Sequence, residues 1–425
     1  MFVPSLRGDG RSLATLRRSV AVESLLRWVA NHHERRGRRG AIIPWFLVAT
    51  LAVFLIIYTT WFLISHRHRQ EELQAACDAA ALAGAIALCD EELLSDHPHR
   101  FEVVHERARA ATLKYACLNF VDARRLKLDP KGLNCPDGEM VLGHLDCPDS
   151  RDFDCTLDNP ELNAVRVKVK RGGTIAAATA FVDRDVIGFR PQGQNPLPVV
   201  PLAILADLIP SLFFPMLDSW DAQIEGRLGT FHWLIDPETL KPRHVRKGER
   251  DDRIPEIRVC FTTKRRRCNG RVARIGDVGN EDAVWRQVRD GISRCDLQQL
   301  GGELVLPDPR ETSEPLFLPR LELSEDDLKE FAQAFLKMQL TGERRIWMLY
   351  SPKFDRKRHD GEPVLGVVGF VAAHVMDVRL QKDKLCVVLQ PGMRITDTAI
   401  TDCKRRDLGP RPIHNPYVCR VRLVE

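Results

Sequence analysis

No cysteine occurs among the first 76 residues of this 425-residue sequence, and all twelve cysteines lie between Cys77 and Cys419. This asymmetry favours an oxidising compartment for the later part of the chain. The even count permits pairing but reveals no connectivity, and buried unpaired thiols would account for the cysteines equally well. Twelve cysteines are few for a chain of this length, so disulfides need not carry all of its stability.

Strings typical of catalytic and metal sites are also missing. The sequence has no Gly-x-Ser-x-Gly elbow, no His-Glu-x-x-His pair, no Walker loop and no Gly-x-Gly-x-x-Gly. The closest cysteines, Cys147 with Cys155 and Cys260 with Cys268, are eight residues apart, which excludes the Cys-x-x-Cys knuckles of structural zinc sites. We therefore expect no catalytic residues, no cofactor and no metal. A hydrolase facing the outside would need a pocket of titratable side chains, and no spacing of Asp, Glu or His residues in the sequence points to such a pocket.

The charge balance gives no indication of a nucleic-acid partner. The net charge is +5, with 28% charged and 44% hydrophobic residues, as in a globular chain with one membrane segment. Two basic runs, Lys264 to Arg267 and Arg356 to His359, could bind an anionic polymer or form solvated loops.

One long apolar run begins at Ala41 and continues to Ile64 without a charged residue. At about 1.5 Å of rise per residue, its helix would cross the roughly 30 Å hydrocarbon core of a bilayer. Trp45 near one end and Trp61 near the other suit the two interfaces. Residues 41–64 are therefore predicted to form a single transmembrane helix.

The residues around this run predict its orientation. The preceding segment, 1–40, is rich in arginine and ends with Arg35, Arg36, Arg38 and Arg39, whereas two arginines follow the run closely. This excess predicts a cytoplasmic N-terminus, one pass through the inner membrane, and an outer location for the bulk of the chain. A cleaved secretory signal is the alternative, but its apolar region would span about 7–15 residues.

The next segment, 70–94, contains no proline and is rich in alanine, leucine and glutamate, which are strong helix formers. We expect the transmembrane helix to continue through it. Small residues then form two rows along the helix, Ala76, Ala80 and Gly84 in one and Ala79, Ala83 and Ala87 in the other. Such rows allow close approach of another backbone, either a partner helix or this chain's own sheet.

At this point the sequence resembles a known family. Residues 36–90 resemble the N-terminal module of TadG-like proteins of the Flp (tight adherence) pilus assembly system. The likeness is carried by Arg38, Arg39 and Gly40 before the apolar run, and by Asp78, Ala79, Ala80, Ala81, Leu82, Ala83, Gly84 and Ala85 after it. The resemblance implies a membrane-anchored, pilin-like envelope protein that helps to build or anchor a pilus. Its implied partners are other pilus-assembly or envelope proteins, with the extended helix as a surface for oligomers.

Two features depart from this family. Related prepilins are cut after a glycine that precedes the apolar run and carry Glu at the fifth mature position, but a cut between Gly40 and Ala41 would place Trp45 there. That argues against processing. Many TadG-like proteins also carry a von Willebrand type A domain with an Asp-x-Ser-x-Ser loop. The nearest string here, which begins at Asp218, lacks the second serine, so metal-dependent adhesion is not supported.

Residues 65–190 are predicted to form a long helix packed on a small antiparallel sheet, a pilin-like plan. A second helix over 98–120 could fold back along the first, bringing Cys117 near Cys77 or Cys89. Those two cannot pair with each other, because 12 residues of helix separate them by about 18 Å. Alternation from Ala164 to Lys170, the Gly172-Gly173 turn and a strand to Val182 predict a hairpin. Cys135, Cys147, Cys155, Cys260 and Cys268 are further candidates for disulfides.

A Pro-rich linker and apolar segment is predicted at 191–218, with a domain boundary near residue 195. Residues 219–425 are predicted to form an outer mixed α+β domain, with strands near 255–262, 346–350, 364–380, 385–389 and 418–424. One helix should carry Val284, Val288, Ile292 and Cys295 on its apolar side; a second should begin with a capping box of Ser324 and Asp327.

These patterns predict an α+β protein without enzymatic activity. Its expected function is that of a membrane-anchored structural or assembly component of a tight adherence pilus or related envelope machinery. The alternative is an envelope-anchored binding protein that has the same anchor but no role in a pilus.

Overall fold

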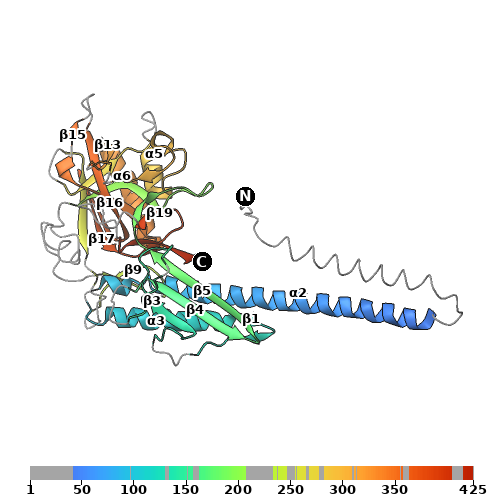
Figure 1. Cartoon of the computed structure of the whole chain (residues 1–425). Helices are drawn as coiled ribbons and strands as arrows, with labels where there is room; N and C mark the ends of the chain where they lie inside the picture. The colour runs from blue at the N-terminus through green and yellow to red at the C-terminus, as the bar shows by residue number, and fades with distance from the viewer. Residues whose placement is uncertain are drawn as a thin grey trace. The chain divides into compact units, whose positions relative to one another are not determined.

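The computed structural model describes residues 42–95, 97–129, 134–150, 152–156, 162–206, 233–236, 238–246, 254, 256–264, 268–276, 282–308, 311–312, 314–354, 356–357, 363–403 and 415–424. The chain divides into two compact units between His68 and Arg69. The architecture is α+β, with one long apolar helix near the N-terminus and a sheet-rich remainder (Figure 1).

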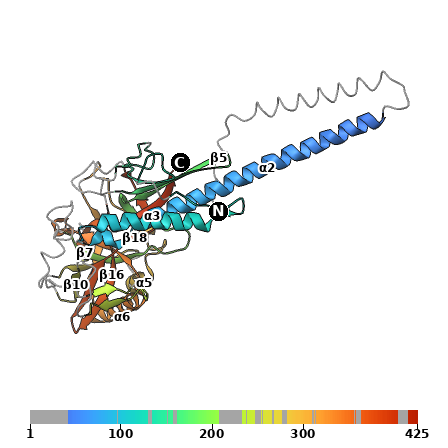
Figure 2. The same cartoon turned by 90° about the horizontal axis from the view of Figure 1, so that it is seen from below.

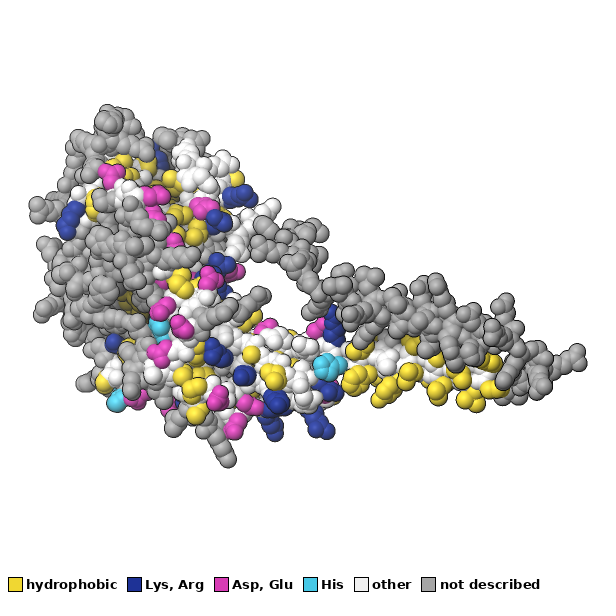
Figure 3. Space-filling view, viewed as in Figure 1, with side chains coloured by type: hydrophobic (Ala, Val, Ile, Leu, Met, Phe, Trp, Pro, Cys, Tyr) yellow, Lys and Arg dark blue, Asp and Glu magenta, His cyan; other side chains and the backbone are white. Residues whose placement is uncertain are grey.

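The longest helix, α2 (Ile42–Ala87), has residues in both units. Its first half has a mean hydropathy of 2.3 over 18 residues, and no part of that window is buried. Phe46, Leu55 and Trp61 are each more than three-fifths exposed, and hydrophobic side chains line this half in Figure 3. The hydroxyl of Thr59 donates to the Leu55 carbonyl oxygen at 2.8 Å, so the helix itself satisfies this polar group. By length and composition, α2 could span a membrane.

The later part of α2, from Arg69 onward, packs in a helix-and-sheet module within the second unit. It is followed by the 3-10 helix η1 (Glu91–Leu94) and by α3 (Arg100–Leu118), which lies beside it (Figures 1 and 2). Both helices share a core with a five-stranded sheet in the order β18-β20-β5-β4-β3. Its strands are β3 (Met140–Gly143), β4 (Ala164–Arg171), β5 (Thr174–Asp183), β18 (Arg394–Ile395) and β20 (Val418–Val424).

The predicted hairpin is confirmed. Strands β4 and β5 pair antiparallel from Ala164 with Phe181 to Arg171 with Thr174. Gly172 and Gly173 both have positive φ values, 55° and 82°, which a two-residue hairpin turn of this hand requires. On β4 the buried residues Val165, Val167 and Val169 alternate with more exposed ones, so one face of the hairpin covers the helices.

The chain also forms a larger sheet of eight strands, five of which pair in a closed ring. Strand β16 pairs with β13, β13 with β11, β11 with β7, β7 with β14, and β14 again with β16. Only the β7–β14 contact is parallel in this ring. Its strands are β7 (Val199–Leu205), β11 (Gly270–Ala273), β13 (Leu316–Leu321), β14 (Arg345–Tyr350) and β16 (Pro363–Gln381); β10 (Ile257–Thr262), β15 (Arg356–Lys357) and β17 (Lys384–Pro391) complete the sheet.

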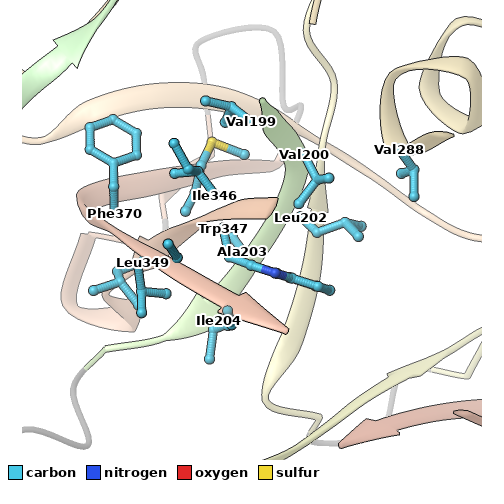
Figure 4. Close-up of a cluster of buried hydrophobic side chains, with 14 of the residues drawn as sticks. Val199, Val200, Leu202, Ala203, Ile204, Val288, Ile346, Trp347, Leu349 and Phe370 are labelled. Atoms are coloured by element: carbon cyan, nitrogen blue, oxygen red, sulfur yellow. The ribbon is translucent and has the colours of Figure 1, made fainter. Parts of the chain in front are cut away.

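Two helices cover this sheet. The first, α5 (Asp282–Asp290), packs on β7, and the second, α6 (Glu325–Thr341), packs on β16. Trp347 is fully buried and stacks on Phe335 of α6, with ring centroids 5.5 Å apart. Figure 4 shows the side chains of β7 and β14 that meet in this core. The capping box of Ser324 and Asp327 is confirmed.

Smaller elements complete the described chain. They are β1 (Phe120–Val121), β2 (Arg124–Arg125), β6 (Val186–Phe189), β8 (Trp233–Ile235), β9 (Pro242–His244), β12 (Leu304–Val305), β19 (Ala399–Thr401), η2 (Gln298–Leu300) and η3 (Pro352–Phe354). Strands β12, β6 and β19 form one sheet, β8 and β9 another, and β1 and β2 a third. Helix α5 ends at Asp290 before Gly291, whose φ is 97°, so Ile292 and Cys295 lie beyond the helix expected to carry them.

The predicted division at residue 195 does not match the sheets. Part of the expected linker forms β7, a central strand of the ring, while residues 207–218 of that segment are outside the described range. The last strand, β20, leaves the expected outer domain and pairs with β5 in the helix-and-sheet module. The pairing of β7 within the ring and that of β20 with β5 both join residues far apart in sequence, and local sequence patterns cannot predict such pairings.

Candidate functional site

The small residues of α2 form two different surfaces. Ala76, Ala80 and Gly84 are buried in a core with α3 and the five-stranded sheet. A Cβ atom added at Gly84 would lie 2.2 Å from Thr112 Oγ1 of α3 and 3.1 Å from Val165 of β4. This first row therefore serves the chain's own packing.

The second row is only partly covered. Ala83 is 8% exposed, whereas Ala79 and Ala87 are half-buried. The rest of the family-like motif divides in the same way: Asp78 and Leu82 are half-buried, and Ala81 and Ala85 are fully buried.

An apolar stripe remains accessible along the later part of α2. We define it by Ala75, Ala79, Leu82 and Ile86, which recur at intervals of four, three and four residues and so share one side of a helix. Ala75 is exposed and Ile86 is 49% exposed. Of the motif residues, Ala79 and Leu82 lie on this stripe, and Ala75 and Ile86 extend it on either side of the motif.

The end of α2 is tied to α3 and to the segment after β5, and we call residues 88–94 the junction. Asp90 caps η1 by accepting from the Glu92 backbone N–H at 2.9 Å and also binds Arg107 of α3 at 2.7 Å. Arg184, after β5, donates to the Leu88 carbonyl oxygen at 3.3 Å. The helix end is therefore held by residues from two other elements.

A hydrogen bond between buried His374 and half-buried Glu91 joins the junction to the large sheet. Nε2 of His374, on β16, lies 3.0 Å from Glu91 Oε1, and its Nδ1 lies 3.2 Å from the Gly342 carbonyl oxygen. Arg344 reaches the same Glu91 oxygen at 3.3 Å. Burial alone would raise the pKa of Glu91, but the hydrogen bond from His374 and the positive charge of His374 and Arg344 outweigh it and lower that pKa.

A second charged group near the junction behaves in the opposite way. Asp183, at the end of β5, is fully buried and binds Arg422 of β20 at 2.5 Å. Burial raises its pKa despite this partner. Arg394, on β18, is held among Arg345 and Arg344, and its burial lowers its pKa to about 10. The contact between the two sheets thus concentrates ionisable side chains of both signs.

The cysteines pair differently from the prediction. Disulfides join Cys147 to Cys403 and Cys260 to Cys386. Cys260 and Cys386 lie directly opposite each other in the antiparallel β10–β17 ladder, a register that sequence spacing could not reveal. Cys77, Cys117, Cys135, Cys155 and Cys268 are unbonded.

The expected pairing of Cys117 with Cys77 or Cys89 is therefore not found. Cys77 points into the core of α2, α3 and the sheet, where burial raises its pKa to about 12. Cys89 instead faces Cys419 of β20, with their Sγ atoms 3.2 Å apart. The prediction missed this partner because β20 reaches the junction only through long-range pairing with β5.

Several predicted residues lie outside the described range. These are the topology residues Arg35, Arg36, Arg38 and Arg39, the processing position Gly40-Ala41 and the string at Asp218. Within the described part of the chain, no three His, Cys, Asp or Glu side chains are grouped to hold a metal ion. One hollow of about 50 Å³ lies beside Lys264, Arg271 and Glu322 on the large sheet.

Sequence patterns predicted helix α2 but did not predict the contacts that its end makes at the junction. His374 and Glu91 are separated by 283 positions, and neither belongs to a recognisable motif.

A scan against models of protein families finds no match for the chain, and searches of curated proteins and of solved structures find none either.

Proposed function

We propose that this protein is a membrane-anchored structural or assembly component of a tight adherence pilus or related envelope machinery. Its N-terminus faces the cytoplasm, and residues from 65 onward lie outside it. The observation that carries the proposal is helix α2, which combines an uncovered apolar length with an alanine-rich continuation packed on a sheet. A helix that leaves the bilayer and becomes the spine of a folded module is the plan of a pilin-like subunit.

The cysteine chemistry supports this orientation. Both disulfides lie beyond the apolar length, and disulfides persist in oxidising compartments. The arginine-rich segment before Ala41 supports it as well, because basic residues are retained on the cytoplasmic side. A reporter enzyme fused after Glu425 should be active outside the cytoplasm, and the chain should resist carbonate extraction. A cytoplasmically active reporter would contradict the orientation.

The surface through which the protein would assemble is the apolar stripe on α2. Alanine and other small residues let another helix approach closely, and Ile86 adds apolar area to the contact. The first row of small residues is unsuitable for this role, because Ala80 and Gly84 already contact α3 and the sheet. The proposed partner is a helix of another pilus-assembly or envelope protein.

The test is site-specific photocrosslinking in cells that carry the pilus genes. A benzophenone amino acid would be placed at Ala75 or Ile86 on the stripe, and at Leu118 of α3 as the matched control, since Leu118 is 60% exposed. We expect adducts from the stripe that disappear when the pilus genes are deleted, and none from Leu118. Monomer alone at the stripe positions, in a chain still retained in the membrane, would favour the plain anchor.

A further inference from the structure

We propose that Cys89 and Cys419 form a third disulfide, which fastens the end of α2 to the last strand of the chain. Their Sγ atoms are 3.2 Å apart, closer than ordinary contact between two unbonded sulfurs. Roughly 1 Å of closure would bring them to the bonding distance of about 2.05 Å. This site does not depend on a role in a pilus; it requires only the oxidising compartment that the other two disulfides indicate.

Both cysteines are positioned by ordered backbone. The Cys89 N–H donates to the Ile86 carbonyl oxygen at 3.0 Å at the end of α2. Cys419 pairs with Ile395 in the β18–β20 ladder, and its carbonyl oxygen accepts from Thr396 at 3.0 Å. Since the helix end and the strand are each fixed in this way, the approach of the two sulfurs follows from the fold.

The surroundings assign the first attack to Cys89. A hydrogen bond from the Cys419 thiol and the nearby Arg184 guanidinium favour a thiolate at Cys89 and lower its pKa, although burial opposes them. The thiolate at Cys89 and burial together raise the pKa of Cys419. The pair therefore has one thiol that ionises readily and one that keeps its proton until the second step.

The oxidant is the disulfide of an envelope thiol–disulfide oxidoreductase. The Cys89 thiolate attacks one sulfur of that disulfide, breaks its S–S bond and releases one oxidant thiolate, leaving a mixed disulfide. Cys419 then loses its proton and attacks the Cys89 sulfur, which releases the second oxidant thiolate. Two electrons and two protons pass to the oxidant. Cys89 is only half-buried, whereas Cys419 is 1% exposed, so in the folded chain the attack on the oxidant falls to Cys89.

The bond can be detected directly in the full-length protein. The chain would be purified from membranes, alkylated with iodoacetamide in denaturant without reductant, and digested with trypsin. We expect the peptide of residues 70–100 linked to the peptide of residues 407–420, lighter than the two free thiol peptides by two hydrogen atoms. Since the first peptide also contains Cys77, the Cys77→Ala variant assigns the link to Cys89. Recovery of Cys89 and Cys419 both alkylated overturns the proposal.

Stability provides a second, independent readout. Cys89→Ser, Cys419→Ser and the double variant should lower the melting temperature of the oxidised full chain by the same amount, because each removes the same bond. The matched control is Cys117→Ser, at an unbonded, half-buried position, which should leave both the linked peptide and the melting temperature unchanged. Additive losses from the two single variants would mean that the cysteines act as separate packing residues and would contradict the bond.

Discussion

Gly84 of α2 and Thr112 of α3 meet so closely that a methyl group on Gly84 would lie 2.2 Å from the Thr112 hydroxyl oxygen. Replacing a helical glycine by alanine ordinarily stabilises a helix by about 1 kcal/mol. Here the steric cost should exceed that gain, since overpacking a core costs about 1–3 kcal/mol. We expect Gly84→Ala to lower the free energy of unfolding of the full chain in detergent, measured by urea titration.

The control for this prediction uses the same helix. Ala75 is exposed, so Ala75→Leu adds bulk without meeting the core and should leave the unfolding midpoint unchanged. Thr112→Ala removes the clashing hydroxyl and should recover part of the loss caused by Gly84→Ala; Val165 still limits full recovery. A Gly84→Ala variant as stable as the wild type would show that α2 and α3 do not pack as described.

The hydrogen bond between half-buried Glu91 and buried His374 should make stability depend on pH. Because the pKa of Glu91 is lowered in the fold, its carboxylate stabilises the native state above the ordinary glutamate pKa of about 4.3. That contribution is lost as the pH falls through the lowered value. We expect Glu91→Gln to cost about 1–3 kcal/mol near pH 7, and the gap between variant and wild type to narrow below pH ~4.3.

Urea titrations of the full chain between pH 7 and the acid range would measure this gap. The matched control is Glu106→Gln, since Glu106 is an exposed carboxyl on α3. It should change neither the stability nor its pH profile. A gap for Glu91→Gln that stays constant with pH would mean that the carboxylate is not the source of the coupling between η1 and β16.

Local patterns predicted those parts of the fold that local interactions determine. The apolar run, the Gly172-Gly173 turn and the Ser324 capping box each depend on neighbours in sequence, and the structure contains all three features. The continuation of α2 beyond the apolar run follows from helix propensity in the same way.

Long-range pairing explains what the sequence could not predict. The placement of β20 beside β5, and hence of Cys419 against Cys89, depends on how a distant segment completes a sheet edge. The two rows of small residues on α2 looked equivalent in the sequence. Their difference arises because α3 and β4 cover Gly84, whereas Ala79 and Ala87 stay only half-buried, which only the folded arrangement reveals.

The disulfide between Cys260 and Cys386 should contribute strongly to the stability of the large sheet. It links β10 to β17 across 126 positions, and a closed loop of that size corresponds to about 4–5 kcal/mol in the chain-entropy account. We expect the Cys260→Ser/Cys386→Ser double variant to unfold at clearly lower urea than the wild type. Cys268→Ser, an unbonded position eight residues from Cys260, is the control and should have little effect. Equal midpoints for the double variant and the wild type would refute a stabilising bond.

Removal of the last strand should disrupt the helix-and-sheet module, although more than two hundred positions separate the strand from β5. A chain that stops at Tyr417 loses the partner of β5 from Thr179 to Asp183 and the Arg422 side chain that binds buried Asp183. An uncompensated buried carboxylate and an open sheet edge are both costly. Hydrogen exchange should therefore show lost protection at Ala180 and along the later part of α2, while Met348 in the ring stays protected. The control is the point variant Leu423→Ser, at an exposed position of the same strand, which should preserve the wild-type pattern of protection. Unchanged protection at Ala180 in the truncated chain would show that β20 is dispensable to this sheet.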